Sequence, residues 1–287
     1  MELLIGGLAS GSITALIALG VVMVFRATGI VNFAQGELLM IGAYSYVLAS
    51  RMTDSPVLQI AIALSAGAIG GLVCFVVTHF FLRGASDIVL VIGTLALLIF
   101  AQSGARIIFT DNPQRAVGWI SGSANINIFG ASIAVNSILT LIVSAIAAAA
   151  LLVWLGFTRV GHSVQAAAED SWRASLTGVH VRRTLGLSWA IGGALAAMAG
   201  VFLSPITGVY PTMGADVILS AFVAVSIGGF KSLTGALLGG LIVGVVQTYA
   251  VTYLGGAFRD VVLFVILLGL LLWRPTGLFQ GRKTRVV

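Results

Sequence analysis

The chain has 287 residues, of which 59% are hydrophobic and 8% are charged, and its mean hydropathy is +1.11. Soluble domains carry about 25% charged residues, so this composition excludes a protein whose whole surface faces water. The net charge of +6 would fit a nucleic-acid partner, but the basic residues flank apolar segments, which indicates membrane topology and no nucleic acid.

Apolar segments separated by short polar breaks follow one another along the whole chain. A helix needs about 20 apolar residues to cross the hydrocarbon core of a membrane, and runs that are continuous rather than alternating exclude a β-barrel. The sequence therefore predicts an all-α polytopic membrane protein with one transmembrane domain over residues 1–287. The expected spans are 3–25, 33–49, 57–82, 87–109, 133–157, 185–203, 217–227, 233–254 and 261–273.

The seventh segment, 217–227, is short for a span, so nine crossings are expected, with eight as the alternative if this segment is re-entrant. Lys and Arg gather in the loop 158–183 and in the C-terminal tail. Because cytoplasmic loops carry an excess of basic residues, we expect this loop and the C-terminus in the cytoplasm and the N-terminus outside.

Several local signals mark the ends and contacts of the spans. Asn32 is a candidate N-cap with Gln35 three residues later, as in a capping box, and Ser232 is a second candidate cap. Pro205 is expected to end its helix, and Gly228 and Gly229 to form a helix break. Glycines four apart, which let helices approach closely in lipid, occur as Gly7 and Gly11, Gly67 and Gly71, Gly235 and Gly239, and Gly240 and Gly244.

The loop 158–183 contains a segment, 163–177, that fits an amphipathic helix outside the membrane. Val164, Ala168, Trp172 and Leu176 recur at i+4 spacing on one face. Glu169 and Arg173 form an i,i+4 pair, and Gly178 can end the helix in a left-handed conformation. Such a helix either docks on a partner protein or lies on the lipid surface.

Polar side chains at membrane depth are costly and are therefore candidates for function. The candidates for a translocation pathway are Asn32, Gln35, Glu37, Gln102 and Gln247. For Glu37, the structural alternative is a favourable interaction with the N-terminal dipole of its helix.

Three stretches carry a resemblance to a known family: 28–37 (TGIVNFAQGE), 166–179 around Ala166-Ala167-Ala168-Glu169-Asp170, and the glycine pairs after 228 together with 274–279 (RPTGLF). Together they resemble the permease subunits of branched-chain amino acid ABC transporters, and the LivH-type more than the LivM-type. The resemblance covers almost the whole chain. It implies a LivH-like importer permease in the bacterial inner membrane that carries a branched-chain amino acid or a related small amide or acid.

The resemblance also implies the partners: two cytoplasmic ATPase subunits that hold ATP and Mg, a LivM-like second permease, an extracytoplasmic solute-binding protein, and membrane lipid. This chain itself contains no Walker A motif and is expected to bind no cofactor or metal. The loop 158–183 would then hold the coupling helix. The residues expected to contact the ATPase are Ala167, Ala168, Glu169, Asp170, Ser171, Ala174 and Gly178.

An enzyme is not expected, because the histidines are far apart in sequence and no G-x-S-x-G motif occurs. The alternative function is an ATP-independent secondary transporter or channel. The halves 3–109 and 185–273 are candidates for an inverted repeat, with matching breaks at 32–37 and 228–232.

Overall fold

The computed structural model describes residues 2–82, 84–116, 125–128, 131–274 and 277–278. Part of the C-terminal motif (275–276 and 279) and the basic tail residues from 282 onward therefore lie outside the described residues. The elements are α1 (Glu2–Thr28), α2 (Gln35–Ser50), α3 (Pro56–Val76), the π-helical η1 (Val77–Phe81), α4 (Asp87–Phe109), β1 (Asn125–Ile128), β2 (Ala131–Ala134), α5 (Val135–Phe157), α6 (Arg159–Glu169), α7 (Ser171–Leu176), α8 (Val181–Thr207), α9 (Met213–Gly228), α10 (Leu233–Leu254), the short 3-10 helix η2 (Gly256–Phe258) and α11 (Arg259–Trp273).

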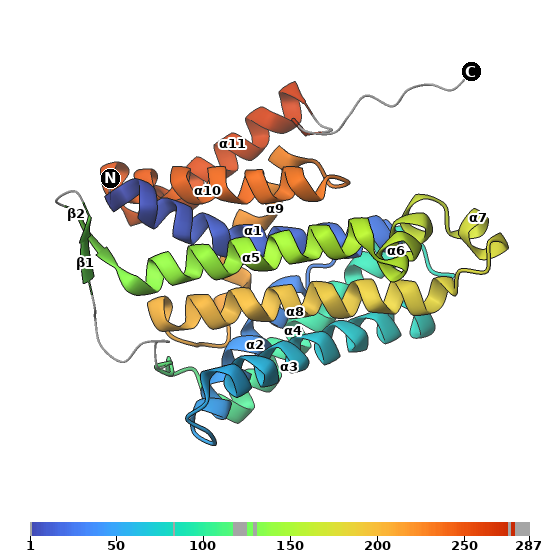
Figure 1. Ribbon diagram of the computed structural model, residues 1–287, viewed down its shortest axis with the longest axis horizontal. Coiled ribbons are helices and arrows are strands. Elements are labelled where there is room, and N and C mark those ends of the chain that lie inside the picture. Colours follow the sequence, from blue (N-terminus) through green and yellow to red (C-terminus); the bar gives the residue numbers. More distant parts are fainter. Residues whose placement is uncertain (1, 83, 117–124, 129–130, 275–276, 279–287) are drawn as a thin grey trace.

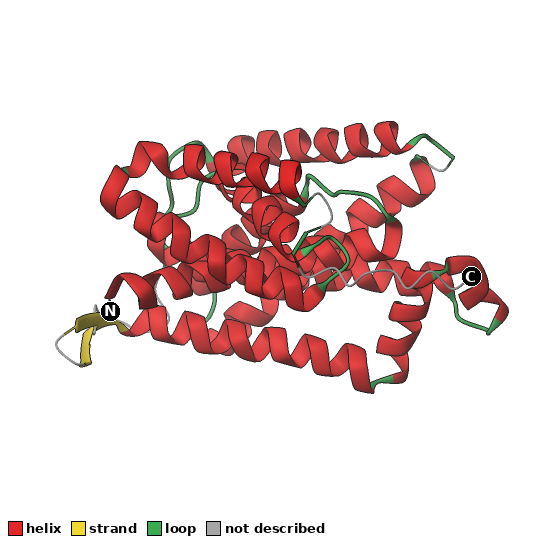
Figure 2. Cartoon of the chain, turned by 90° about the horizontal axis from the view of Figure 1, so that it is seen from above, coloured by secondary structure: helices red, strands yellow, loops and turns green. Residues whose placement is uncertain are grey.

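The helices form one elongated bundle with two distinct ends (Figures 1 and 2). The helices α6 and α7 project at one end, called here the loop end. The N-terminus and the antiparallel hairpin of β1 and β2 lie at the other, called here the hairpin end. This hairpin was not predicted from the sequence. The strand β1 lies between the expected spans 87–109 and 133–157, and β2 overlaps the expected start of the span 133–157.

Seven of the described helices are long and apolar enough to cross a membrane. The other two long segments, α2 and α9, have 16 residues each and begin inside the bundle, where Gly36 lies against Gly214. From this meeting point they run in opposite directions. The residue after α2, Arg51, bonds to Gln114 at the hairpin end, whereas α9 is followed by Lys231 at the loop end.

The non-helical segments 29–34 and 208–212 lead from the bundle ends to the starts of α2 and α9. Each connection, together with the 16-residue helix that follows it, therefore leads from one end of the bundle to the middle and on to the other end. Together with the seven longer helices, the described chain passes nine times between the two ends of the bundle.

The two halves of the chain repeat the same arrangement in opposite directions. Helices α1 and α8 each have 27 residues, and each is followed by a short connection and a 16-residue helix. Helix α1 packs on α10 as α8 packs on α3, and α1 and α8 run in opposite directions (Figure 1). The break that matches 29–34 is 208–212, however, so the expected match at 228–232 is wrong.

Close approach of helix backbones holds these pairs together. A Cβ atom added at Gly11 would lie 2.9 Å from the Cα of Leu241, and one at Gly7 would lie 2.9 Å from the Cα of Val245. On the other side, Gly67 and Gly71 face the backbone of α8. The glycines expected from their four-residue spacing are therefore confirmed as helix contacts.

Helix ends follow the local chemistry with some exceptions. Ser232 caps α10, since its Oγ accepts a hydrogen bond from the N–H of Gly235 at 3.0 Å, as expected. Gly229, with φ 91°, ends α9 directly after Gly228, which confirms a break there. Helix α8 continues through Pro205 to Thr207, contrary to expectation. Proline cannot donate to the carbonyl four residues earlier, and the Oγ of Ser204 donates to that carbonyl, Val201, at 3.0 Å instead.

Candidate functional site

A buried polar cluster lies at the start of α2. The Nδ2 of Asn32 donates to the Oε1 of Gln35 at 3.3 Å, and its Oδ1 accepts from the N–H of Ala34 at 3.1 Å. The Nε2 of Gln35 donates to the carbonyl of Gly192 on α8 at 2.8 Å. The capping-box prediction is thus wrong: α2 begins at Gln35 after Ala34, and the Gln35 side chain joins two helices instead.

Glycines make room for this contact between helices. A Cβ atom at Gly20 on α1 would lie 2.8 Å from the carbonyl oxygen of Gly192, and it would also meet the Gln35 amide. Thr94 on α4 adds a partner that the sequence did not single out, because its Oγ1 accepts from the N–H of Phe33 at 3.3 Å. The residues joined here are far apart in the chain, so sequence spacing carries no signal of their contact.

Glu37 lies next to this cluster, and only one of its two carboxylate oxygens is hydrogen-bonded. The residue is 1% exposed, and its Oε1 accepts from the Nε2 of Gln102 on α4 at 3.0 Å. Its Oε2 has no hydrogen-bond partner. The structure thus brings Asn32, Gln35, Glu37 and Gln102 to one region, from segments of the chain about 65 residues apart.

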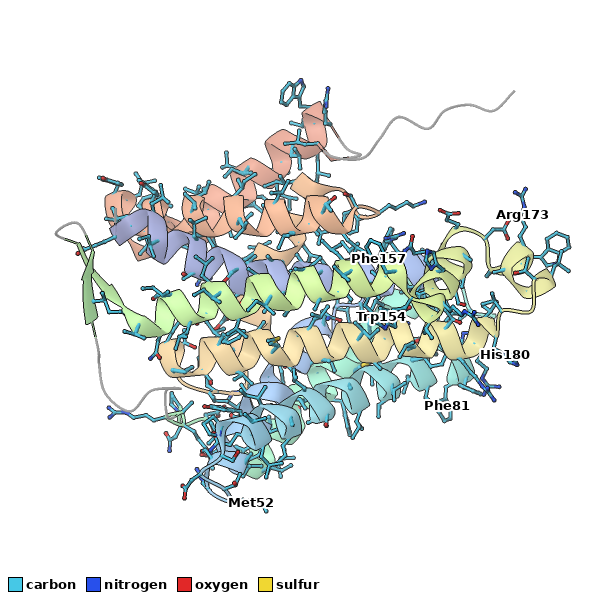
Figure 3. The ribbon with its side chains drawn as sticks, in the orientation of Figure 1. Met52, Phe81, Trp154, Phe157, Arg173 and His180 are labelled. Atoms are coloured by element: carbon cyan, nitrogen blue, oxygen red, sulfur yellow. The ribbon has the colours of Figure 1, made fainter. Side chains whose placement is uncertain are left out.

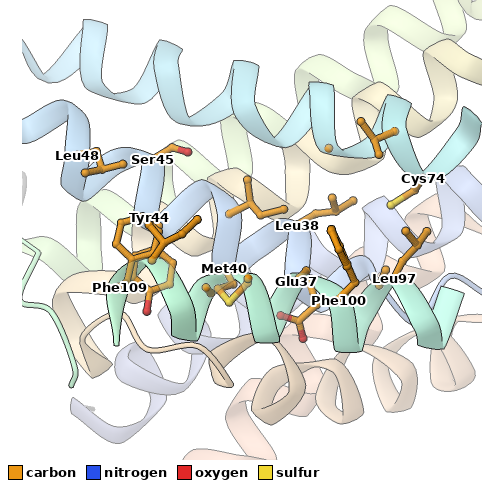
Figure 4. Close-up of a pocket in the computed structure, with 18 residues that line it drawn as sticks. Glu37, Leu38, Met40, Tyr44, Ser45, Leu48, Cys74, Leu97, Phe100 and Phe109 are labelled. Carbon is orange, nitrogen blue, oxygen red and sulfur yellow. The ribbon is translucent and has the colours of Figure 1, made fainter. Parts of the chain in front are cut away.

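Glu37 lines a cavity of about 360 Å³ between α2, α3 and α4 (Figure 4). The remaining wall is largely aliphatic and aromatic, with Leu38, Leu97 and Phe100 near Glu37 and the stacked pair Tyr44 and Phe109 further along. The hydroxyl of Tyr44 is also buried without a partner. The cavity wall is thus largely apolar, and two of its lining residues, Glu37 and Tyr44, each have a polar atom buried without a partner.

Gln247 lies outside this cluster. Its Nε2 donates to the Oγ of Ser220 on α9 at 2.7 Å. It lines a separate cavity of about 290 Å³ near the hairpin end, between α1, α8, α9 and α10. Gln247 therefore does not share a site with Glu37.

The loop-end segment is two helices rather than the single one expected over 163–177. The helical conformation is interrupted at Asp170, whose φ and ψ of −154° and 101° are extended. The Oδ1 of Asp170 accepts from the N–H groups of Trp172 and Arg173 at 3.0 Å each and so caps α7. Because of this break, Arg173 pairs with Asp170 at 3.1 Å and not with Glu169 as predicted.

The break also divides the expected apolar stripe. Val164 is buried against the bundle, whereas Trp172 and Leu176 on α7 are 69% and 68% exposed. Figure 3 shows Arg173, also on α7, at the opposite end of the molecule from Met52. Helix α7 therefore presents an uncovered apolar surface beyond the bundle.

The residues expected to contact an ATPase fall into two groups. Ala167 and Ala174 are buried within the chain. The more accessible group consists of Ala168, Glu169, Asp170, Ser171 and Gly178. Gly178 has φ 84° after the end of α7, as expected for a left-handed cap.

A hollow of about 780 Å³ lies beside this turn at the loop end. Its lining combines acidic and basic side chains from three parts of the chain: Glu169 and Asp170 from the α6–α7 turn, Arg26 from the end of α1, and Lys231 from the connection of α9 and α10. A polar, charged hollow at the end of an apolar bundle is suited to contact with a water-soluble partner rather than with lipid.

Comparison with known proteins points to one family. The chain matches the family described as "Branched-chain amino acid transport system / permease component" over residues 3–271. It is 34% identical to the high-affinity branched-chain amino acid transport system permease protein LivH of Salmonella typhimurium, with 97% of this chain and 94% of that protein covered. It is 33% identical to the permease protein BraD of Pseudomonas aeruginosa, with 97% and 95% covered.

A solved structure shares the fold. The structure titled "PsaBC from Streptococcus pneumoniae in complex with Fab" matches with a TM-score of 0.53 at 15% identity, covering 96% of this chain and 93% of that one.

Proposed function

The chain belongs to the family of branched-chain amino acid transport permeases, and on this premise we propose that it is the membrane-spanning permease subunit of an ATP-driven importer. Its solute is a branched-chain amino acid or a related small amide or acid. The relatives are named as transport permeases and not as enzymes. ATP hydrolysis therefore takes place on partner subunits.

The observation that carries the ATP-driven mechanism is the pair of exposed apolar side chains on α7. Trp172 and Leu176 lie i,i+4 on a helix that projects from the loop end. Exposed aromatic and aliphatic residues rimmed by charges are typical of protein interfaces. We assign this surface to a cytoplasmic ATPase, one for each of two permeases, with Mg and ATP bound by the ATPases.

A partner that moves α7 can also move the helix bundle, because α6, which precedes α7, is hydrogen-bonded to α5. The Nε2 of Gln165 donates to the carbonyl of Leu155 on α5 at 2.6 Å. Thr158 caps α6 by accepting from the N–H of Gly161 at 2.9 Å and donates to Trp154 at 2.7 Å. A shift of α6–α7 during ATP binding would therefore be passed to α5, and the bundle would shift between inward-open and outward-open populations.

The orientation proposed is loop end in the cytoplasm of a bacterial inner membrane, with the N-terminus outside and the C-terminus inside. Support comes from the distribution of basic side chains. The loop end carries Arg26, Arg159, Arg173, Arg182, Arg183, Lys231 and Arg274, whereas the hairpin end carries Arg51, Arg106, Arg115 and Arg259. An extracytoplasmic binding protein would deliver the solute at the hairpin end.

The pathway is proposed to pass the buried polar cluster of Asn32, Gln35, Glu37 and Gln102, with Gln247 lining a separate cavity. Two half-helices whose N-termini meet inside a bundle mark the solute site in many transporters. A LivM-like paralogue is proposed as the second permease, because the relatives that cover nearly the whole chain include LivH proteins.

The test is purification of the tagged chain from its native host in mild detergent, followed by mass spectrometry. We expect ATPase subunits and a second permease in stoichiometric amounts. In proteoliposomes, solute uptake by this complex should require ATP and the binding protein. Recovery of a folded chain alone, with solute flux that is independent of ATP, would refute the proposal and favour a secondary transporter or channel.

A second arm uses Ala168, which lines the loop-end hollow together with Arg26. An Ala168→Trp variant is expected to insert and express normally but to lose uptake, since the larger ring fills the hollow. The matched control is Val265→Trp on α11, where the side chain is already exposed on the side of the bundle. Normal uptake by the Ala168→Trp variant would refute the assignment of this surface to the ATPase.

A further inference from the structure

A group of basic and aromatic side chains lies at the loop end, where η1, which continues α3, meets the start of α8. The guanidinium carbon of Arg182 lies over the ring of Phe80, 3.9 Å from its centroid. Arg183 and His180 are exposed, and Phe81 is 78% exposed. Figure 3 shows Phe81 and His180 at the same end of the molecule. These five residues are called here the α3–α8 patch.

Close packing of α3 on α8 holds the aromatic part of the patch in place. The ring of His79 stacks on Phe75 with their centroids 5.0 Å apart, and the edge of Phe80 meets His79 at 5.9 Å. A Cβ atom added at Gly186, four residues after Arg182 on α8, would lie 3.3 Å from the Cε1 of Phe75. Since a guanidinium group stacks favourably on an aromatic face, the Phe80 ring orients the Arg182 side chain before any ligand binds.

The positive charge of the patch is not neutralised by the protein. The ion pairs of the described residues join Arg106 to Asp111 and Arg173 to Asp170. Neither Arg182 nor Arg183 has a carboxylate partner within this part of the chain. Both lie in the first turn of α8, which contains no acidic residue. The helix dipole is positive at this end, so it adds to their charge rather than offsetting it. The patch therefore favours an anionic partner.

The position of the patch along the bundle indicates which anion is available. Phe80 and Phe81 are the last residues of the apolar segment Pro56–Phe81, which is long enough to cross a membrane. Aromatic side chains at the end of a span are typical of the level of the lipid headgroups. Arg173 on α7 projects further from the bundle than Phe81 does (Figure 3). The patch thus lies closer to the lipid than the surface of α7 does, and basic sites between helices at this level bind anionic headgroups.

We propose that the α3–α8 patch binds the headgroup of an anionic phospholipid such as phosphatidylglycerol. The guanidinium groups of Arg182 and Arg183 contact the phosphate oxygens, because a guanidinium group pairs with phosphate through two charge-assisted hydrogen bonds. Phe80 and Phe81 lie against the glycerol and the first carbons of the acyl chains. The inference requires only that the chain spans a membrane, so it does not depend on which solute is carried or on ATP.

The test is native mass spectrometry of the purified permease complex in detergent, titrated with dioleoylphosphatidylglycerol. A double variant, Arg182→Gln with Arg183→Gln, removes both charges from exposed positions and leaves the packed residues of α3 and α8 intact. We expect its affinity for this lipid to fall about tenfold or more. The matched control, Arg51→Gln with Arg115→Gln, removes two exposed charges at the hairpin end and should bind the lipid as the unmodified complex does. Equal affinity in the first double variant and the unmodified complex would overturn the proposal.

A second double variant separates a built site from diffuse attraction. Arg182→Lys with Arg183→Lys keeps the charge but loses the planar guanidinium groups that stack on Phe80 and bind phosphate at two points. We expect its affinity for dioleoylphosphatidylglycerol to fall about threefold. An unchanged affinity would show attraction by charge alone and would contradict the guanidinium contacts.

Three further measurements identify the partner. Dioleoylphosphatidylcholine, which carries no net charge, should bind about tenfold more weakly than dioleoylphosphatidylglycerol, and equal affinities would show a site for acyl chains alone. Soluble glycerol 3-phosphate should not displace the bound lipid, and displacement would show a site for a soluble phosphate. The glutamine variant of Arg182 and Arg183 should retain its ATPase subunits. Loss of those subunits with unchanged lipid affinity would assign the patch to the ATPase. Each of these contrary results would overturn the proposal.

Discussion

The crossing of α2 and α9 inside the bundle offers a direct test of the fold. Gly36 and Gly214 face each other there with their backbones in contact. A Cβ atom at Gly36 would lie 2.8 Å from the carbonyl carbon and 3.2 Å from the Cα of Gly214, and it would also meet the Gly214 carbonyl oxygen. Each of these atoms belongs to the backbone and cannot rotate away, so Gly36→Ala must push the two half-helices apart.

The size of the effect follows from two opposing contributions. Alanine favours a helix over glycine by about 0.5–1 kcal/mol. Overpacking of a tight contact costs about 1–3 kcal/mol, and the high end applies when backbone atoms must move. With an overpacking cost of about 3 kcal/mol, we therefore expect a net loss of about 2–2.5 kcal/mol. On the scale of soluble domains of about 150–250 residues, where 1 kcal/mol corresponds to about 2–4 °C, the melting midpoint falls by roughly 4–10 °C.

The assay is the loss of the monodisperse peak in fluorescence-detected size-exclusion chromatography after heating in detergent. The matched control is Gly104→Ala on α4, where an added Cβ atom has nothing within 4 Å. This control should melt at the same temperature as the unmodified chain or slightly higher. Equal midpoints for Gly36→Ala and Gly104→Ala would contradict the close crossing of the half-helices.

Three further changes test the loop end and a helix cap. Asp170→Ala removes the acceptor of two N–H groups at the start of α7, at a cost of about 1 kcal/mol. It should weaken ATPase binding severalfold, measured by titrating the ATPase into permease nanodiscs. Asp170→Ser, which keeps a capping oxygen, should not weaken this binding. Trp172→Ala should weaken the same binding at least tenfold, as expected for a buried interface aromatic, and Met52→Ala at the hairpin end should have no effect. Ser232→Ala should lower the melting midpoint by a few degrees, because it removes the cap of α10, and an unchanged midpoint would contradict that role. Ser232→Asn should retain most of the stability.

The sequence predicted the features that depend on neighbouring residues. Apolar run length located the spans, because a helix must present about 20 apolar residues to lipid. The same local logic located the cap at Ser232 and the left-handed Gly178. Four-residue spacing of glycines predicted the close helix pairs, since i and i+4 share one helix face.

The contacts between segments that are distant in the chain were not predicted from the sequence. The Gln35 amide was expected to turn back on its own helix, yet it bonds to α8. Nothing in the spacing of Glu37 and Gln102 indicated that they pair. The match between the two halves was placed at the wrong break, because glycine content alone does not reveal where a chain re-enters a bundle.

The loop end shows where local and tertiary effects compete. A periodic stripe over 163–177 predicted one helix, but the Asp170 side chain favours a new cap and divides it. Tertiary packing then buried Ala167 and Ala174 and left Trp172 and Leu176 exposed.

The sequence by itself determined that this chain is a helical membrane bundle with a polar projection, since hydropathy and helix periodicity are local properties. Only the tertiary structure decided which polar groups meet inside the bundle and which apolar groups remain uncovered, because both depend on how separate helices cross.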